Sequence, residues 1–192
     1  YRGNCEDDAI MTFVDRIQPF LQRPHVVILG AGASLAAFPN GDKNGRRIPL
    51  LRDMVDVVGI KGLLTSAGVV DPLDDFESLY SNLVEDSSKV SLVQELESRV
   101  FDYFSQLELP ECPTLYDHLV LSLRPKDVIA TFNWDPFLFQ ACVRNRRIQD
   151  IPTVLFLHGN VAIGTCVQHK PTSVGGRAGV CRNCGELLQD SR

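Results

Sequence analysis

The fold of this chain is decided at His25-Val26-Val27-Ile28-Leu29-Gly30-Ala31-Gly32-Ala33-Ser34, a short apolar run that ends in a glycine turn. The run from Val26 to Leu29 is typical of a strand that is covered on both faces in a parallel sheet. Gly30 and Gly32 can adopt backbone angles that are closed to other residues, and they leave their N–H groups open to a ligand. With the N-terminus of the next helix, these N–H groups predict an anion site that suits a dinucleotide pyrophosphate.

An ordinary strand-to-helix turn is the alternative for this stretch. The dinucleotide-binding pattern has a third glycine or alanine where this chain has Leu35, and no acidic residue follows a second strand at the usual distance. Whether this turn binds a ligand therefore depends on which other residues of the chain lie beside it.

The composition predicts one soluble globular domain. The chain has 192 residues, of which 44% are hydrophobic and 22% are charged, so it can form a sizeable core. Its net charge of −5, with basic residues only in short separate groups, argues against a nucleic-acid-binding surface. No apolar run approaches the roughly 20 residues of a membrane helix and no signal peptide is visible, so no membrane partner is expected. Half of the 6 cysteines are scattered and half cluster late in the chain, which fits a reducing compartment and predicts a cytoplasmic location.

Two further strands complete a parallel sheet. One is predicted at 127–132, followed by Asn133-Trp134-Asp135-Pro136 and a helix, and the other at 153–157, ending in His158-Gly159-Asn160. Alternating strands and helices predict parallel pairing with right-handed crossovers. The expected fold class is α/β: a Rossmann-like parallel sheet with an inserted helical subdomain and a small zinc-binding module, truncated at the C-terminus. The expected domains are a Rossmann-like unit over 1–160, with the helical insertion at about 50–123, and the zinc-binding module over 161–192.

Helical periodicity marks the insertion and the start of the chain. One apolar stripe of the insertion contains Phe76, Leu79, Tyr80, Leu83 and Val84, and a second contains Val90, Val93, Leu96, Val100, Phe101, Phe104 and Leu107. A later helix is expected to carry Leu115, Leu119 and Leu123, and an N-terminal helix Ile10, Phe13, Val14, Ile17 and Leu21. The polar stretch 38–49 is either a loop that folds over a ligand or a surface excursion. A cleft between the inserted helices and the sheet is a natural ligand site.

Polar side chains follow the carboxyl ends of all three predicted strands, where open parallel sheets bind ligands. They are Ser34 after the first strand, Asn133 and Asp135 after the second, and His158 after the third. Each has a purely structural alternative. Asp135 before Pro136 can begin a helix, Asn133 can be a turn residue, and His158 can simply end its strand. Their joint occurrence at successive strand ends favours a shared site.

Cysteine and histidine pairs near the end of the chain predict a zinc site. Cys166 and His169 form one pair and Cys181 and Cys184 the other, each with two residues between its members, and eleven residues separate the pairs. A Cys₃His set closes a tetrahedron around Zn²⁺. The glycine-rich segment between the pairs has little core of its own and would gain stability from a metal. The alternatives are a tail with incidental cysteines, or a site that needs a ligand beyond Arg192.

With these motifs the chain resembles the sirtuin superfamily, and within it the sirtuin-like NAD hydrolases of bacterial defence systems. The resemblance spans residues 26 to about 185 and rests on Gly30-Ala31-Gly32-Ala33-Ser34, Thr131-Phe132-Asn133-Trp134-Asp135, Leu157-His158-Gly159 and the cysteine pairs, in the family's order. It implies that NAD binds between a Rossmann-type domain and a smaller zinc or helical domain. It also implies cleavage of the bond between nicotinamide and ribose.

The resemblance also implies which residues act. The implied NAD-binding residues are Gly30, Ala31, Gly32, Ala33, Ser34, Thr131, Asn133 and Asp135. Asn133 would orient water or ribose, Asp135 would meet the nicotinamide carboxamide, and His158 would be the general base. Histidine suits that role because it can accept a proton near neutral pH. Nicotinamide leaves as a neutral molecule, so the barrier lies in stabilising an oxocarbenium-like ribose.

The implied function is an NAD hydrolase that releases nicotinamide and ADP-ribose, as an effector domain in antiviral defence. An NAD-dependent protein deacylase is one alternative, but sirtuin deacylases have a Phe-Arg pair that Gly41-Asp42 replaces here. A module that senses NAD or ADP-ribose without turnover is another. The family's sheet continues with further strands that this sequence does not supply, so the chain is either a fragment or has an incomplete cofactor site. A homo-oligomer and an appended sensor or effector domain in a longer chain stay open as partners.

Overall fold

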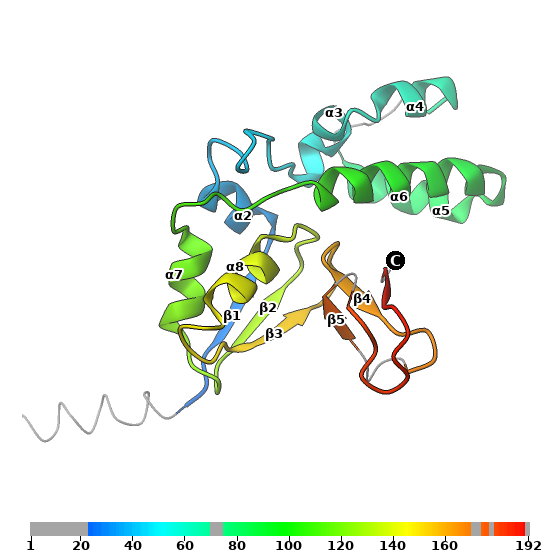
Figure 1. The fold of residues 1–192 in the computed structure, drawn as a ribbon. Coiled ribbons are helices and arrows are strands. Elements are labelled where there is room, and N and C mark those ends of the chain that lie inside the picture. The colour runs from blue at the N-terminus through cyan, green and yellow to red at the C-terminus, as the bar shows by residue number, and fades with distance from the viewer. Residues whose placement is uncertain (1–22, 70–74, 170–173, 177–178, 191–192) are drawn as a thin grey trace, which may run out of the picture.

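A three-stranded parallel sheet lies at the centre of the molecule (Figure 1). The structure is a computed structural model that describes residues 23–69, 75–169, 174–176 and 179–190. The expected N-terminal helix with Ile10 to Leu21 lies outside the described residues. The strands, in the order in which they pair, are β1 (Val26–Leu29), β2 (Val128–Thr131) and β3 (Thr153–Phe156). Leu29 pairs with Thr131 and Thr131 with Phe156, so the three strands end side by side.

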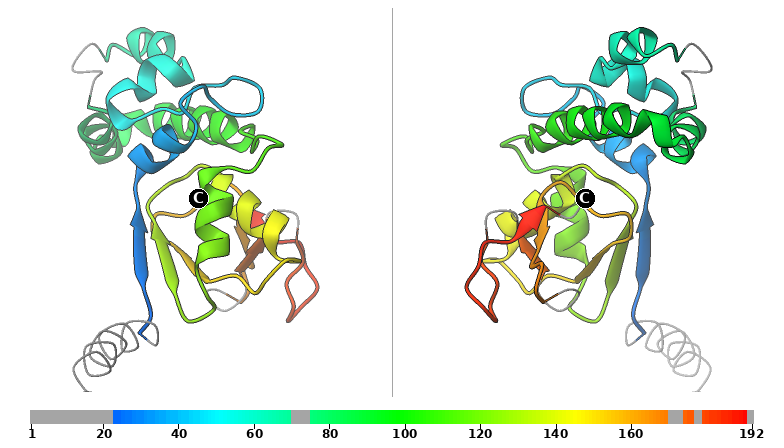
Figure 2. Two further views of the ribbon diagram at one scale, coloured as in Figure 1. Left: turned by 90° about the vertical axis from the view of Figure 1, so that its left-hand side faces the viewer. Right: turned by 90° about the vertical axis from the view of Figure 1, so that its right-hand side faces the viewer.

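Helices cover one face of this sheet and leave the other open among the described residues. Helices α7 (Leu115–Ser122) and α8 (Phe137–Asn145) pack together on the covered face (Figure 2). On the opposite face Val26 is 64% exposed, Ile28 68% and Leu155 46%. The expectation that β1 is covered on both faces is therefore wrong for the part of the chain described. Four apolar residues in a row cannot show which face receives a helix, because that depends on the tertiary arrangement.

A layer of helices lies beyond the carboxyl ends of the strands (Figure 1). Its members are α2 (Ala31–Ala37), the 3-10 turn η1 (Leu51–Asp53), α3 (Met54–Val58), α4 (Lys61–Ser66), α5 (Phe76–Glu85), η2 (Ser87–Lys89) and α6 (Val90–Ser105). The two predicted stripes fall on α5 and α6, and the core takes Phe76, Leu79, Leu83, Leu96, Val100 and Phe104 from them. Val84 and Val90, at the edges of these stripes, are 55% and 53% exposed.

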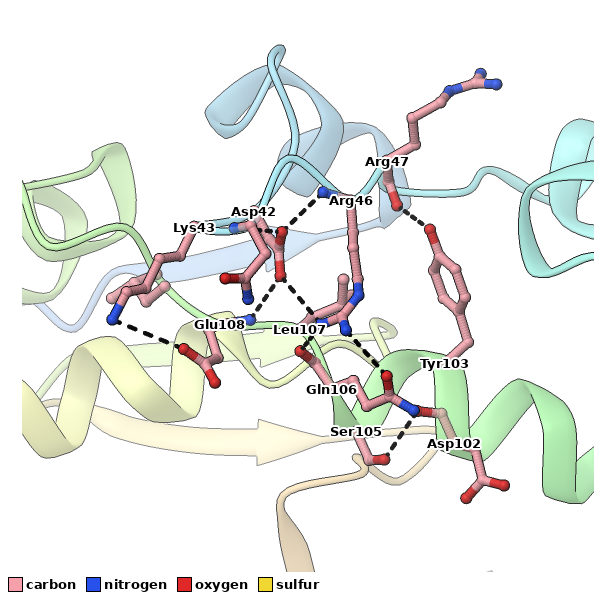
Figure 3. A network of polar contacts seen from close by, with 12 residues as sticks. Asp42, Lys43, Arg46, Arg47, Asp102, Tyr103, Ser105, Gln106, Leu107 and Glu108 are labelled. Atoms are coloured by element: carbon pink, nitrogen blue, oxygen red, sulfur yellow. Dashed lines mark hydrogen bonds and ion pairs between the residues drawn. The ribbon is translucent and has the colours of Figure 1, made fainter.

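The polar stretch after α2 is tied down by one buried carboxylate. Asp42 accepts hydrogen bonds from the backbone N–H groups of Asn44 and Arg46, both at 2.8 Å, and of Glu108 at 3.0 Å (Figure 3). Glu108 follows α6, so Asp42 fastens the stretch to the helical layer. Tyr103 of α6 adds a hydrogen bond from its hydroxyl to the carbonyl oxygen of Arg47 at 2.7 Å (Figure 3). The stretch is thus anchored to the helical layer at Asp42 and at Arg47.

Helix α7 begins with a capping box that extends into an ion pair. The Thr114 N–H donates to Asp117 Oδ2 at 2.7 Å, and Arg144 Nε of α8 donates to Asp117 Oδ1 at 2.9 Å. Burial raises the pKa of Asp117, but hydrogen bonds from Arg144, Thr114 and Asn145 outweigh it and hold the pKa at about 2. The helix buries Tyr116 and Val120, whereas Leu115 of the expected apolar set is 60% exposed.

Replacing Asp117 by alanine is expected to lower the free energy of unfolding by about 3 kcal/mol at pH 7, because Arg144 loses its buried partner. The pKa of Asp117 is depressed in the folded state, so its contribution is present above about pH 4 and is lost as the pH falls toward 2. Urea unfolding at pH 7 and pH 3 measures this, with the exposed Asp102→Ala on α6 as the control. A loss of the same size at both pH values would assign the effect to packing rather than charge.

After β3 the chain forms a small antiparallel sheet of its own, in the order β5-β4-β6. Its strands are β4 (Ile163–Thr165), β5 (Val174–Gly176) and β6 (Gln189–Asp190), and the sheet lies beyond β3, on the side away from β1 (Figure 2). A Cβ on Gly176 would come within 2.9 Å of the Phe139 ring, so this module packs closely against α8. Within the described ranges, no helix has both the length and the apolar character that a membrane crossing requires.

Candidate functional site

The glycine turn leads from β1 into α2 and leaves open space beside it. Gly30 has an extended backbone with φ −118°, and neither it nor Gly32 is among the glycines with positive φ. The turn therefore does not use the special backbone angles that the sequence suggested. A Cβ added at Gly30 or Gly32 would meet nothing within 4 Å, so a ligand can approach the backbone here.

Ser34 is the buried polar residue of α2 and connects three elements. Its hydroxyl donates to Asp135 Oδ2 at 2.6 Å, beyond the end of β2. Because the Ser34 proton points to Asp135, the Tyr116 hydroxyl of α7 donates to Ser34 Oγ, at 2.7 Å. Asn133 Nδ2 also donates to Ser34 Oγ, at 2.9 Å. The structure thus brings together Ser34, Asn133 and Asp135, which the sequence placed at successive strand ends.

Tyr116 is the member of this cluster that the sequence analysis missed. It is 3% exposed, and its phenol oxygen lies 3.4 Å from Asn133 Nδ2. The signal was present as a tyrosine among apolar residues in the first turn of a helix, since buried tyrosines need a partner for the hydroxyl. Nothing local indicated that this partner would be Ser34, 82 residues earlier.

Asn133 is held rigidly by its backbone while one side-chain atom stays unpaired. Its N–H donates to Thr131 Oγ1 at 3.1 Å, and its carbonyl oxygen accepts from Asn160 Nδ2 at 3.3 Å. Thr131 is buried and supports the backbone of Asn133, and it does not line the cavity described below. Asn133 Oδ1 is buried without a hydrogen-bond partner among the described residues. An orphaned buried acceptor is costly, so it favours a ligand or water that donates to it.

Asp135 is a buried carboxyl group with a perturbed pKa. Burial raises its pKa to about 6, although the hydrogen bonds from Ser34 and from the Phe137 N–H lower it in part. Asp135 does not cap α8 with its side chain at the N-cap, because Pro136 occupies that position, but its Oδ1 accepts from the Phe137 N–H at 3.3 Å. Perturbed carboxyl groups of this kind cluster at functional sites.

Replacing Asp135 by asparagine is expected to stabilise the protein at neutral pH. Because folding raises the pKa of Asp135 from 3.8 to about 6, the contribution of Asp135 to the free energy of unfolding is fully present below about pH 4 and is lost as the pH rises to about 6. The stability of the variant relative to wild type should thus rise by about 1 to 3 kcal/mol between pH 4 and pH 7.5. Urea unfolding of both proteins at these pH values tests the prediction. The same difference in free energy of unfolding at both pH values would contradict it.

His158 follows β3 and is exposed, with its ring against Phe132 at a centroid distance of 5.0 Å and an angle of 72°. It does not point into the apolar core. His158, Asn133, Asp135 and Ala31 all line one cavity of ≈ 640 Å³ between the strand ends and the helical layer. Ser34 lies behind this wall, in contact with Asp135 and Asn133.

A Cys/His cluster in the small module could hold a metal ion such as zinc. The ligand atoms of Cys166, His169, Cys181 and Cys184 all lie within 4.8 Å of one another. Cys166 Sγ lies 3.5 Å from His169 Nδ1 and 3.6 Å from Cys184 Sγ. Tetrahedral Zn²⁺ with Zn–S of about 2.3 Å would place neighbouring sulfurs about 3.8 Å apart, which these distances match.

The backbone around Cys181 is shaped for this cluster. The N–H of Asn183 points to Cys181 Sγ at 3.4 Å, and the N–H of Gly185 donates to the Cys181 carbonyl oxygen at 2.8 Å. Gly185 has φ 75°, a left-handed conformation that favours glycine. This tight turn brings Cys181 and Cys184 to one side. The structure therefore confirms that the four predicted residues come together in a cluster that could hold a metal ion.

Known proteins add no family assignment. No family model matches the sequence, and the comparison with curated proteins finds no significant match. The function must therefore be argued from the residues of this chain.

Proposed function

We propose that this chain binds NAD at the carboxyl edge of its parallel sheet and hydrolyses the bond between nicotinamide and ribose. The observation that carries the proposal is the grouping of Asn133, Asp135 and His158 around one cavity, with a buried acceptor on Asn133 that no described residue satisfies. Sites of this kind at the strand ends of a parallel sheet are where nucleotides bind. The open backbone at Gly30 and Gly32 supports a pyrophosphate beside the cavity.

Each polar residue has a task in this reaction. Asn133 Oδ1 accepts a hydrogen bond from a ribose hydroxyl or from the attacking water. The exposed imidazole of His158 takes the proton that this water loses. Water adds to the ribose carbon while the bond to nicotinamide breaks, and the electron pair of that bond neutralises the pyridinium charge. The products are nicotinamide, ADP-ribose and one proton, so the equation balances.

Asp135 fits the carboxamide of nicotinamide. Its Oδ2 accepts from Ser34 and its pKa is raised to about 6 by burial, so near neutral pH it is mostly ionised but sensitive to its surroundings. A carboxylate in this position accepts a hydrogen bond from an amide N–H₂ group. The contact orients the leaving group without taking part in proton transfer.

The metal of the small module is proposed to be zinc with a structural role. Three cysteines and one histidine give a closed tetrahedral donor set, which is typical of structural zinc. When bound, zinc would crosslink the turn at Cys181 to the segment with Cys166. The cluster supplies no residue to the cavity, so no step of the reaction depends on it.

Nicotinamide release from NAD tests the proposed function. The protein should release nicotinamide and ADP-ribose in equal amounts with NAD alone. Release that requires an acyl-lysine peptide would establish a deacylase instead, and NAD binding without release would establish a sensor. Absence of both binding and release would refute the proposal.

A further inference from the structure

The charge of the cavity lining indicates which part of a substrate can enter it. Several side chains of the wall are aromatic: Phe76, Tyr80, Phe101, Phe104, Phe132 and Trp134. Three carboxyl groups are added by Glu77, Glu97 and Asp135, and no lysine or arginine lines the cavity. Such a lining is unfavourable for phosphate groups and favourable for an aromatic cation.

We propose that the helical wall of this cavity binds an N-substituted pyridinium cation and so selects the oxidised dinucleotide over the uncharged nicotinamide ring of the reduced form. This deepens the proposed function, on which its biological meaning rests.

Helix α6 builds the recognition wall. Glu97, Phe101 and Phe104 lie on one face of α6 at helical spacing, and all three line the cavity. Phe104 meets Trp134 at a centroid distance of 6.0 Å and an angle of 87°. Trp134 comes from the strand end, between Asn133 and Asp135, so the aromatic wall reaches the polar cluster.

One hydrogen bond fixes the position of the acidic group. The Tyr80 hydroxyl of α5 donates to Glu97 Oε1 at 2.5 Å. The hydrogen bond to Glu97, with burial, raises the pKa of Tyr80 to about 12, so the hydroxyl keeps its proton and stays a donor. Because the Glu97 carboxylate and the aromatic rings belong to the lining of the same cavity, both can act on one bound cation.

A matched pair of probes tests this assignment. N1-methylnicotinamide is a pyridinium cation, and nicotinamide is its uncharged counterpart of nearly the same shape. Trp134 is the only tryptophan of the chain and lines the cavity, so its fluorescence reports occupancy, with calorimetry as the independent measurement. We expect the cation to bind about tenfold more tightly than nicotinamide. Equal affinity of the two probes overturns the proposal.

Two variants on α6 show whether the preference for the cation depends on the charge of Glu97. Glu97→Gln keeps an acceptor for Tyr80 and removes one of the three carboxylates of the lining, so it should weaken binding of the cation and reduce the preference over nicotinamide. Glu95→Gln is the control, because Glu95 pairs with Arg99 and does not line the cavity. An unchanged preference in Glu97→Gln also overturns the proposal. NAD cleavage without cation preference would refute only this inference, whereas cation preference without cleavage would refute only the hydrolase.

Discussion

Replacing His158 by alanine is expected to lower the rate of nicotinamide release from NAD by about 10²- to 10⁴-fold, the range in which a general base contributes. The imidazole lines the cavity from the end of β3, and Asn133, which carries the unpaired acceptor, lines the same cavity. Removing it leaves the attacking water without a proton acceptor, while the contacts that hold the substrate remain. The loss should therefore appear in kcat, with little change in KM.

The stability of the His158 variant separates this role from a structural one. His158 is exposed and, within the described part of the chain, its ring packs against Phe132, so the midpoint of thermal unfolding should stay within a few degrees of wild type. His118→Ala is the matched control, because His118 is also exposed but lies on α7, outside the cavity lining. Wild-type turnover in His158→Ala would remove this residue from the mechanism.

The strands and the longer helices could be predicted because their apolar periodicity is strong. The predicted strand at 153–157 is found as β3 (Thr153–Phe156), and the helix expected to carry Leu115, Leu119 and Leu123 is α7 (Leu115–Ser122). Leu115 was expected on the buried face of α7 but is exposed. A short helix with apolar residues on all sides does not show which side packs inward. Short helices such as α4 (Lys61–Ser66) gave no usable signal.

Only those features of the candidate site that follow from the strand topology could be predicted from the sequence. Parallel pairing brings the ends of β1, β2 and β3 to one edge, so Ser34, Asn133 and His158 had to lie near one another. Their hydrogen-bond partners could not be foreseen, because Tyr116 reaches Ser34 from a helix on another layer. The same holds for Asn160, whose amide binds the carbonyl oxygens of Asn133 and Asp135. The domain limits and the NAD-binding assignment remain predictions.

Loss of Cys181, a proposed zinc ligand, should have the largest effect on the small module. In Cys181→Ser, bound zinc is expected to fall from about one per chain to nearly none, since a structural site loses most of its affinity with one thiolate. Among the described residues, the buried apolar cluster of the module consists of Cys166, Cys181 and Leu188, two of which are proposed zinc ligands. Structural zinc supplies about 10 to 16 kcal/mol of apparent binding free energy in small domains, far more than such a cluster can.

Metal analysis measures the loss of zinc, and hydrogen exchange measures the loss of stability in the small module. Amides of β4 (Ile163–Thr165) and of the turn after Cys181 should lose protection in the variant, while those of β2 (Val128–Thr131) keep theirs, because the main core does not include the module's cysteines. Cys112→Ser is the matched control, since Cys112 is free, exposed and outside the cluster. One zinc per chain retained in Cys181→Ser would show that the metal is held elsewhere. Chelation of the wild type should reproduce the exchange pattern of the variant, because both remove the same crosslink between the turn and β4.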